Sequence, residues 1–576
     1  MKIQELIKVQ ISKALTKEAI AVPDFGLEHP EDSLHGDYSS NIAMMIAKSL
    51  GKKPVEVAQK IAEIINKNLP EEITKVEVAG PGFINFFVAE KFVTQSVLAI
   101  LGKGEKYGHS SEGSKRRVLV EYTDPNTFKV FHIGHLMSNA IGESIARLIE
   151  SDGVDVVRVC YPSDIGLHIA KAIWAISQNL QDMPDSSAPI GIRTDFLGRM
   201  YVLGTKTYDE NPEVKKEIDE LNKKIYDKSD DKINEIYEKG RKWSLDHFDL
   251  LYKILGTKFD KFIFESEMAS IGLDVVKQNI GKVFELSDGA TVFKGEEYGL
   301  HTRVFINSHG IPTYEAKDLG LNITKFKNYP DAIESIIITA SEQNDYFRVI
   351  KKVLLLIDET NGNKTKHIGH GMMRFAEGKM SSRTGNVITA DALIEDIKEL
   401  VKDKIKDRKL SKEDADEIAD IVAVGAIKYT ILRSAVGSNI VFDSATSISF
   451  EGDSGPYLQY SAVRAQSIIE KAKEEKIDLS GVSLENILTP NTVYPLEKML
   501  VKFEEIVSRS RADLAPQTVA NYLVNLAGLF NSFYASQVIV DKNNPLSLYY
   551  VALTKAFLIT MTNGLSLLGI RVPRRM

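Results

Sequence analysis

The most restrictive feature of the sequence is residues 116–150, which read as a strand, a tight loop and a helix. Residues 118–120 are Val-Leu-Val, typical of a buried parallel strand, and apolar residues then recur at helical spacing from Leu136 to Leu148. At the N-terminus of a helix that follows such a strand, free backbone N–H groups and the helix dipole face an anion. The stretch therefore predicts an α/β fold with a phosphate site at this turn.

The turn itself contains His-Ile-Gly-His at residues 132–135. Gly134 has no Cβ, so a nucleotide can lie close to the backbone there, and the two histidines can donate hydrogen bonds to phosphate oxygens. This tetrapeptide, between a strand and a helix, resembles the HIGH signature with which class I aminoacyl-tRNA synthetases bind ATP.

The same four letters occur again at residues 367–370, in a predicted strand that no helix follows. We expect His367 and His370 to be ordinary strand histidines. Just downstream, residues 379–383 read Lys-Met-Ser-Ser-Arg and resemble the family's second signature, KMSKS. Only the first HIGH copy has the context and the order that the family requires.

The second lysine of KMSKS is matched by Ser382, so one catalytic cation of the family is missing from this loop. Lys129 stands three residues before His132, where arginyl-tRNA synthetases often carry a lysine instead, and we expect it to supply that charge. The resemblance implies that the catalytic residues are Lys129, His132, His135, Lys379, Ser381 and Arg383. It implies that ATP is bound by Gly134, His132, His135, Met380 and Ser382.

The flanking segments resemble the same synthetases. GDYSSNIA and AGPGFINF, within residues 1–112, resemble the N-terminal domain that contacts the tRNA elbow in arginyl-tRNA synthetases. Residues 453–576 resemble their helical anticodon-binding domain, including the Leu-Gly-Ile…Pro-Arg-Arg-Met ending. Between them we expect a Rossmann-like catalytic domain at 113–390, with a helical insertion at about 176–262, and a helical connection at 391–452. The predicted fold is thus α/β, a parallel-sheet catalytic domain with an α+β N-terminal domain and an all-helical C-terminal domain.

The resemblance extends to the residues that bind the amino acid. Tyr314 and Asp318 are four residues apart on a predicted helix, which places them on one side. Carboxylates match the planar guanidinium fork in bidentate fashion, and two of them can engage the guanidinium and the α-ammonium of arginine. The arginine-binding pattern of the family is matched by Glu121, Asn126, Tyr314, Asp318 and Gln343. Exposed aromatics of the C-terminal domain suggest tRNA contacts at Tyr457, Tyr460 and Tyr534, and the last residue, Met576, is a further candidate.

These resemblances imply an arginyl-tRNA synthetase, which uses ATP to activate L-arginine as arginyl-adenylate and transfers it to the terminal adenosine of tRNA(Arg). ATP with Mg²⁺ is then a substrate, and no tightly bound cofactor or resident metal is expected. The single cysteine, Cys160, excludes an intrachain disulfide and a multi-cysteine zinc site. The absence of a long apolar run or a signal-peptide core predicts no membrane association, and the lone cysteine fits a reducing cytoplasm. We also expect a monomer. A net charge of -7 means that RNA contacts must come from local basic patches.

Three alternatives remain at this point. The chain could be a class I synthetase for cysteine or glutamine, although it lacks zinc cysteines. It could be a coenzyme adenylyltransferase of the HIGH superfamily, although those are small single domains. It could also be a catalytically dead regulator that binds tRNA, a reading that Ser382 supports and the two histidines oppose.

Overall fold

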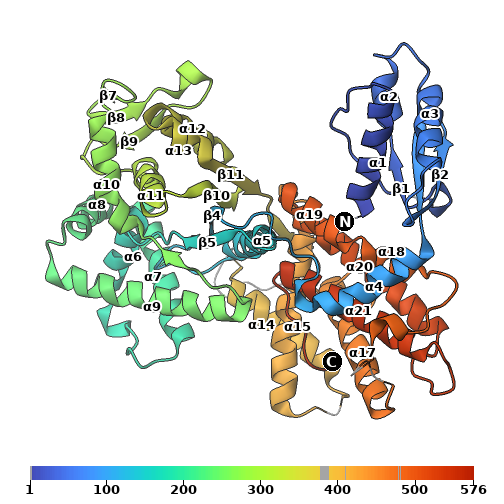
Figure 1. Ribbon diagram of the computed structural model, residues 1–576. Coiled ribbons are helices and arrows are strands. Elements are labelled where there is room, and N and C mark those ends of the chain that lie inside the picture. The colour runs from blue at the N-terminus through green and yellow to red at the C-terminus, as the bar shows by residue number, and fades with distance from the viewer. Residues whose placement is uncertain (1–2, 31, 377–387, 409, 478, 480–481) are drawn as a thin grey trace. The chain divides into compact units, whose positions relative to one another are not determined.

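The computed structural model describes residues 3–30, 32–376, 388–408, 410–477, 479 and 482–576 (Figure 1). The chain forms two compact units. The smaller unit contains residues 1–105, 468–502 and 532–559, and the larger contains 106–467, 503–531 and 560–576. The domain boundaries inferred from sequence do not coincide with these units and stay predictions.

The smaller unit contains a three-stranded antiparallel sheet in the order β1-β3-β2. The Gly-Pro-Gly sequence at residues 80–82 joins β2 to β3. Isoleucines that share one face of the first helix, such as Ile7 and Ile11, are fully buried in its core. Its elements are α1 (Ile3–Lys17), β1 (Tyr38–Ser40), α2 (Ile42–Ala47), α3 (Pro54–Asn66), β2 (Ile73–Ala79), β3 (Phe83–Val88), α4 (Glu90–Lys103) and α18 (Pro495–Val501).

The larger unit is built on a five-stranded parallel sheet in the order β11-β10-β4-β5-β6, which confirms the predicted α/β fold. Helix α5 leads from β4 to β5 on one side, and β10 pairs with β4 on the other, so the strand order reverses beside β4 (Figure 1). Ligands of open α/β sheets bind at the carboxyl ends of strands at such a reversal. The strands are β4 (Arg117–Tyr122), β5 (Asp155–Cys160), β6 (Lys261–Phe262), β10 (Ala332–Ala340) and β11 (Thr365–His370).

Helices and a small sheet interrupt and flank this core. The predicted insertion is helical, and Ile218 and Ile225, at helical spacing, are buried within it. The helices of this region are α5 (Ile133–Glu150), α6 (Leu167–Gln178), α7 (Ile190–Glu210), α8 (Pro212–Asp227), α9 (Asp231–Leu255), α10 (Glu265–Gln278), α11 (Tyr314–Asn328), α12 (Asn344–Ile357) and α13 (Glu359–Lys364). The antiparallel sheet β7-β8-β9 comprises β7 (Glu285–Ser287), β8 (Ala290–Phe293) and β9 (Arg303–Ile306).

Beyond the sheet the chain is mainly helical, as predicted. The elements there are β12 (Met373–Phe375), α14 (Ala390–Ile405), α15 (Lys412–Leu432), β13 (Ile440–Phe442), α16 (Ser444–Ser447), α17 (Gly455–Glu474), α19 (Phe503–Ala512), α20 (Pro516–Ser536) and α21 (Ser547–Leu567). Among the described helices none is long and apolar enough to cross a membrane.

A buried lysine joins distant parts of the larger unit. Lys428 on α15 is 1% exposed, and its Nζ donates to the carbonyl oxygens of Leu255 at 2.7 Å and Gly569 at 2.8 Å. Burial lowers the pKa of this amine to about 7. The end of α9 and the residues after α21 are therefore tied to one side chain of the helical region.

Candidate active site

A cavity of about 470 Å³ lies at the carboxyl ends of the central strands. It is lined by eight of the residues singled out from the sequence, namely Glu121, Asn126, His132, Gly134, His135, Tyr314, Asp318 and Gln343. Tyr314 is 49% exposed and Gln343 is also exposed, whereas Glu121 is buried. The proposed KMSKS residues Lys379, Met380, Ser381, Ser382 and Arg383 lie outside the described residues.

The two histidines of the first HIGH copy cap helix α5. The backbone N–H of Gly134 donates to His132 Nδ1 at 3.1 Å, and the N–H of His132 donates to His135 Nδ1 at 3.3 Å. The rings stack with centroids 3.8 Å apart. Burial, with a smaller effect of the charge of Lys129, lowers the pKa of His132, and the pKa of His135 lies well below its ordinary value. Because each Nδ1 accepts a hydrogen bond, each neutral ring carries its proton on Nε2.

Lys129 precedes this helix but does not line the cavity. Its Nζ lies 4.7 Å from the ring centroid of Tyr201 on α7. Its charge nevertheless contributes to the lowered pKa of both histidines, so it affects the electrostatics of the HIGH residues.

The loop between β4 and α5 is held in a strained conformation. Thr123 and Asp124 have φ angles of 82° and 39°, which β-branched and other non-glycine residues rarely adopt. The N–H of Thr123 donates to Ser138 Oγ at 2.9 Å, and Asp124 Oδ1 accepts from the N–H of Tyr161 at 2.7 Å. Such strain persists where surrounding contacts fix the backbone, as these two bonds do.

The acidic side chains of the cavity differ in their partners. Glu121 Oε2 lies 2.8 Å from Lys325 Nζ, and both side chains are buried. Asp318 accepts a hydrogen bond of 2.6 Å from the hydroxyl of Tyr346, and burial raises the pKa of Asp318 to about 8. Burial, reinforced by the charge of Glu121, also raises the pKa of Asp124 well above its ordinary value. The cavity therefore favours a cationic ligand beside Asp318 and Asp124.

Several residues of the wall were not selected from the sequence. Glu265 is paired with Lys317 at 2.6 Å, and Arg303 lies 3.5 Å from Glu315. The tyrosines Tyr161 and Tyr346 also line the cavity. Position at the carboxyl end of a strand was a usable signal for Tyr161, which directly follows β5, but no sequence pattern distinguishes the other residues.

The second HIGH copy forms strand β11, as predicted. Thr339 Oγ1 lies 2.8 Å from His367 Nε2, and His367 stacks on Phe347 with centroids 4.1 Å apart. His370 is buried at the strand end and lines the cavity. We expected both to be ordinary strand histidines, and the position of His370 makes it a neighbour of the site.

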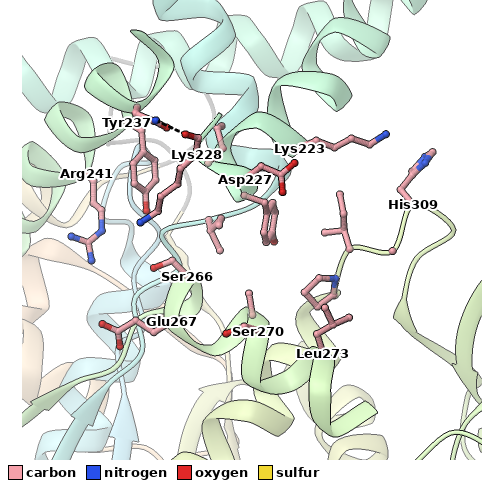
Figure 2. A pocket seen from close by; sticks show the side chains of 18 of the residues that line it. Lys223, Asp227, Lys228, Tyr237, Arg241, Ser266, Glu267, Ser270, Leu273 and His309 are labelled. Carbon is pink, nitrogen blue, oxygen red and sulfur yellow. Dashed lines mark hydrogen bonds between the residues drawn. The ribbon is translucent and has the colours of Figure 1, made fainter. Parts of the chain in front are cut away.

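A second cavity, of about 910 Å³, separates the helical insertion from α10. Figure 2 shows Lys223, Asp227 and Lys228 on one side of it and Ser266, Ser270 and Leu273 on the other. Its lining carries charges of both signs and none of the substrate residues predicted from sequence.

Asp164 links this region to the first cavity. Its Oδ2 accepts from Arg241 Nε at 2.7 Å and from Ser266 Oγ at 2.9 Å, and its Oδ1 accepts from the N–H of Ser266 at 2.9 Å. The neighbours Ser163 and Glu265 line the first cavity, so a fully buried carboxylate ties its wall to helix α9.

The proposed tRNA contacts lie in different surroundings. Tyr457 accepts a hydrogen bond from Asn531 Nδ2 at 3.0 Å. The guanidinium carbon of Arg464 lies 4.8 Å from the ring centroid of Tyr460. Tyr534 is 44% exposed, and Met576 is half-buried.

Comparison with known proteins assigns three regions of the sequence to families. Residues 96–444 match the family "tRNA synthetases class I (R), catalytic domain", residues 1–88 match "Arginyl tRNA synthetase N terminal domain", and residues 458–576 match "DALR anticodon binding domain". An arginine–tRNA ligase of Clostridium botulinum is 32% identical over 557 residues, covering 96% of each chain. One of Borrelia hermsii is 30% identical, covering 100% of this chain and 99% of its own.

Solved structures share the fold. The arginyl-tRNA synthetase of Thermus thermophilus superposes with a TM-score of 0.79 at 23% identity and full coverage of both chains. That of Plasmodium falciparum gives 0.80 at 22% identity, covering 100% of this chain and 99% of the other.

Proposed function

Because this chain belongs to the class I arginyl-tRNA synthetases, we propose that it joins arginine to ATP in the cavity at the carboxyl ends of β4 and β10. Its activity is arginine–tRNA ligation in translation. The family assignment decides against the synthetases for cysteine and glutamine and against the coenzyme adenylyltransferases. What remains to be assigned is the role of each side chain.

The observation that carries the assignment is the distribution of charge in the cavity. Lys325 already neutralises Glu121, whereas Asp318 has a hydrogen-bond donor in Tyr346 but no cation within ion-pair distance among the described residues. Asp124 likewise forms no ion pair there and accepts a backbone N–H. Arginine brings two cationic groups, so its guanidinium and α-ammonium match the two acids left without a cation. We assign the guanidinium to Asp318, with Tyr314 and Gln343 at the mouth and Asn126 and the free oxygen of Glu121 on the inner wall.

The HIGH residues of the lining suit the phosphates of ATP. His132 and His135 are neutral Nε2–H donors beside the N-terminus of α5, where the N–H of Gly134 already donates to His132 Nδ1. In the first step a carboxylate oxygen of arginine attacks the α-phosphorus, and the bond from that phosphorus to the β-phosphate oxygen breaks. The two N–H donors and the helix dipole stabilise the added negative charge, which is greatest in the transition state.

We assign further positive charge near the phosphates to Lys129 and to Lys379 and Arg383 of the second signature. The remaining residues of that signature, Met380, Ser381 and Ser382, are assigned to contacts with the nucleotide. In the second step a hydroxyl of the terminal adenosine of tRNA attacks the arginyl carbonyl carbon, and AMP leaves. Mg²⁺ is proposed to enter with ATP as part of the substrate.

Binding of tRNA(Arg) belongs to the DALR region, residues 458–576. Within and beside it we assign anticodon contacts to Tyr457, Tyr460, Tyr534 and Met576, with Tyr534 first because it is the most exposed of the tyrosines. The protein is proposed to act as a monomer in the cytoplasm.

The test is the variant Asp318→Asn, with Asp345→Asn as its control. Asp345 is an exposed acid near the start of α12 that pairs with Arg348 and does not itself line the cavity. Calorimetry on the intact chain should show that Asp318→Asn weakens arginine binding by at least about 10-fold, since hydrogen bonds to charged groups typically contribute ~1.5–3 kcal/mol. ATP binding should not change in either variant. Unchanged arginine affinity in Asp318→Asn contradicts the assignment of this cavity.

A further inference from the structure

Tyr161 stands at the carboxyl end of β5, in the wall of the substrate cavity. The side chain is more than nine-tenths buried, and its backbone N–H is fixed by Asp124 Oδ1 at 2.7 Å. Its hydroxyl has no hydrogen-bond partner among the described residues, although the oxygen is closed to solvent. Buried polar groups in native proteins nearly always have partners, and Tyr161 lines the cavity, so a ligand that enters it and shifts this side chain slightly can supply the missing partner.

The charges around this hydroxyl indicate which ligand atom fits. After burial itself, the carboxylates of Glu265, Asp318 and Glu121 contribute most to raising the pKa of the phenol, and all three line the same cavity. The hydroxyl therefore lies within the acidic wall and keeps its proton. A group that donates hydrogen bonds and carries positive charge is favoured there, and an anionic group is disfavoured.

The hydrogen-bonding capacity of arginine completes the argument. A guanidinium has five N–H donors spread over a plane, more than Asp318 can satisfy with two oxygens. A phenol oxygen can accept one N–H while its own O–H points toward an acceptor. We propose that the Tyr161 hydroxyl accepts a hydrogen bond from the guanidinium of arginine and is a specificity-determining residue of this enzyme. This inference rests on the proposed position of arginine in the cavity.

Discrimination against lysine follows from this geometry. An ammonium group presents three donors from one nitrogen and cannot reach separated acceptors at once. When lysine enters a site whose acceptors are separated, some of these acceptors stay unpaired. The cost of burying unpaired polar groups then disfavours lysine strongly. In the proposed arrangement Tyr161 adds an acceptor separate from Asp318, which the five-donor guanidinium can engage together with Asp318.

The test is Tyr161→Phe, which removes one oxygen and keeps the ring. The control is Tyr252→Phe, because Tyr252 is a buried tyrosine of α9 whose hydroxyl lies 3.6 Å from Cys160 Sγ and does not line the cavity. Calorimetry on the full chain should use arginine, ATP and agmatine, which retains the guanidinium and the amine but lacks the carboxylate. Thermal unfolding of both variants shows whether the fold is preserved.

We expect Tyr161→Phe to bind arginine and agmatine more weakly by the same factor, roughly 10- to 150-fold, which corresponds to one hydrogen bond to a charged group. ATP binding should be unchanged, and the preference for arginine over lysine in aminoacylation should fall. If the affinity falls for arginine but not for agmatine, the hydroxyl contacts the carboxylate of arginine and not its guanidinium, and the proposal is overturned. An unchanged affinity for arginine would overturn it too. If Asp318→Asn loses arginine and Tyr161→Phe does not, the proposed cavity stands and only the role of Tyr161 fails.

Discussion

Lys325 Nζ lies 2.8 Å from Glu121 Oε2, and the two side chains are 0% and 4% exposed. Helix α11 provides both this lysine and Asp318, which lie two turns apart and hence on similar faces of the helix. One helix thus supplies the cation that neutralises the first acid of the cavity and the acid that remains for the substrate.

Lys325→Met should leave Glu121 buried without a counter-ion. Removing one partner of a buried pair typically costs ~3–5 kcal/mol of unfolding free energy. Urea unfolding should show a loss of that order, and the double variant with Glu121→Gln should recover part of it. Lys327→Met, an exposed lysine on the same helix, is the control and should change stability little.

Arginine binding should release a proton below about pH 8. The pKa of Asp318 is raised to about 8, so at neutral pH the empty site holds the protonated acid, which must ionise to pair with guanidinium. Calorimetry in buffers of different ionisation enthalpy should count at least one proton per arginine near neutral pH, and affinity should rise up to pH 8. Asp318→Asn should lower the count by about one, because Asp124, whose pKa is also raised, can still release its own proton. A proton count of zero for the unmodified chain would show that Asp318 is already ionised.

The same group gives a pH dependence to the stability of the chain without ligand. Its folded pKa lies above the unfolded value, so between about pH 4 and pH 8 the folded state holds a proton that the unfolded state has lost. Stability should therefore decline as pH rises through this window, and the slope should be smaller in Asp318→Asn. Unfolding midpoints across the window, with and without saturating arginine, provide the measurement.

His132→Asn separates the structural role of this histidine from its chemical one. Asparagine is a good N-cap and can accept the hydrogen bond from the N–H of Gly134 in place of the histidine. Alanine cannot accept it, so His132→Ala should lose ~0.5–2 kcal/mol of stability relative to His132→Asn. Both variants should lose on the order of 10²–10³-fold in adenylate formation, since each lacks the Nε2–H donor. Pyrophosphate exchange with tRNA present measures the rate, and unfolding measures the cap. Equal stability of the two variants would argue against the capping role.

Lys129→Ala tests the lysine proposed to replace the missing charge of KMSKS. We expect a loss on the order of 10²–10³-fold in adenylate formation with little change in ATP affinity, as for a charge used mainly in the transition state. Lys215→Ala is a matched control, because Lys215 also lies over a tyrosine of the helical insertion, with its Nζ 5.3 Å from the ring centroid of Tyr208. Near-normal single-turnover activation in Lys129→Ala would assign this lysine to its contact with Tyr201 alone.

Tyr534→Ala should weaken binding of tRNA(Arg) by about 1–3 kcal/mol if one anticodon base stacks on this ring. Tyr298→Ala is the control, because both tyrosines are 44% exposed and Tyr298 belongs to the catalytic region. Filter binding with normal and anticodon-substituted tRNA should show the loss only for the normal tRNA. Comparable losses in both variants would mean that Tyr534 has no special role.

Much of this site was accessible from sequence because its determinants are local. The strand–loop–helix around His132 and the spacing of Tyr314 and Asp318 can be recognised from residues that are close together in the sequence. The electrostatic state of the acids was not accessible. The residue that neutralises Glu121 lies on α11, and the donor to Asp318 lies on α12, so only the register of strands and helices decides which carboxylate is left for the substrate. For the same reason His370 could not be placed beside the cavity until β11 was seen to pair with β10.

The buried amine of Lys428 also bears on how the chain is made. Its two acceptors belong to residues 255 and 569, so a growing polypeptide can supply only one of them until Gly569 has been added. A polypeptide that stops before Gly569 lacks one of these two acceptors, and a buried donor left unpaired costs about 1–3 kcal/mol. The contact between α15 and the end of α9 therefore reaches its full stability only after the segment that follows α21 has been synthesised and has folded.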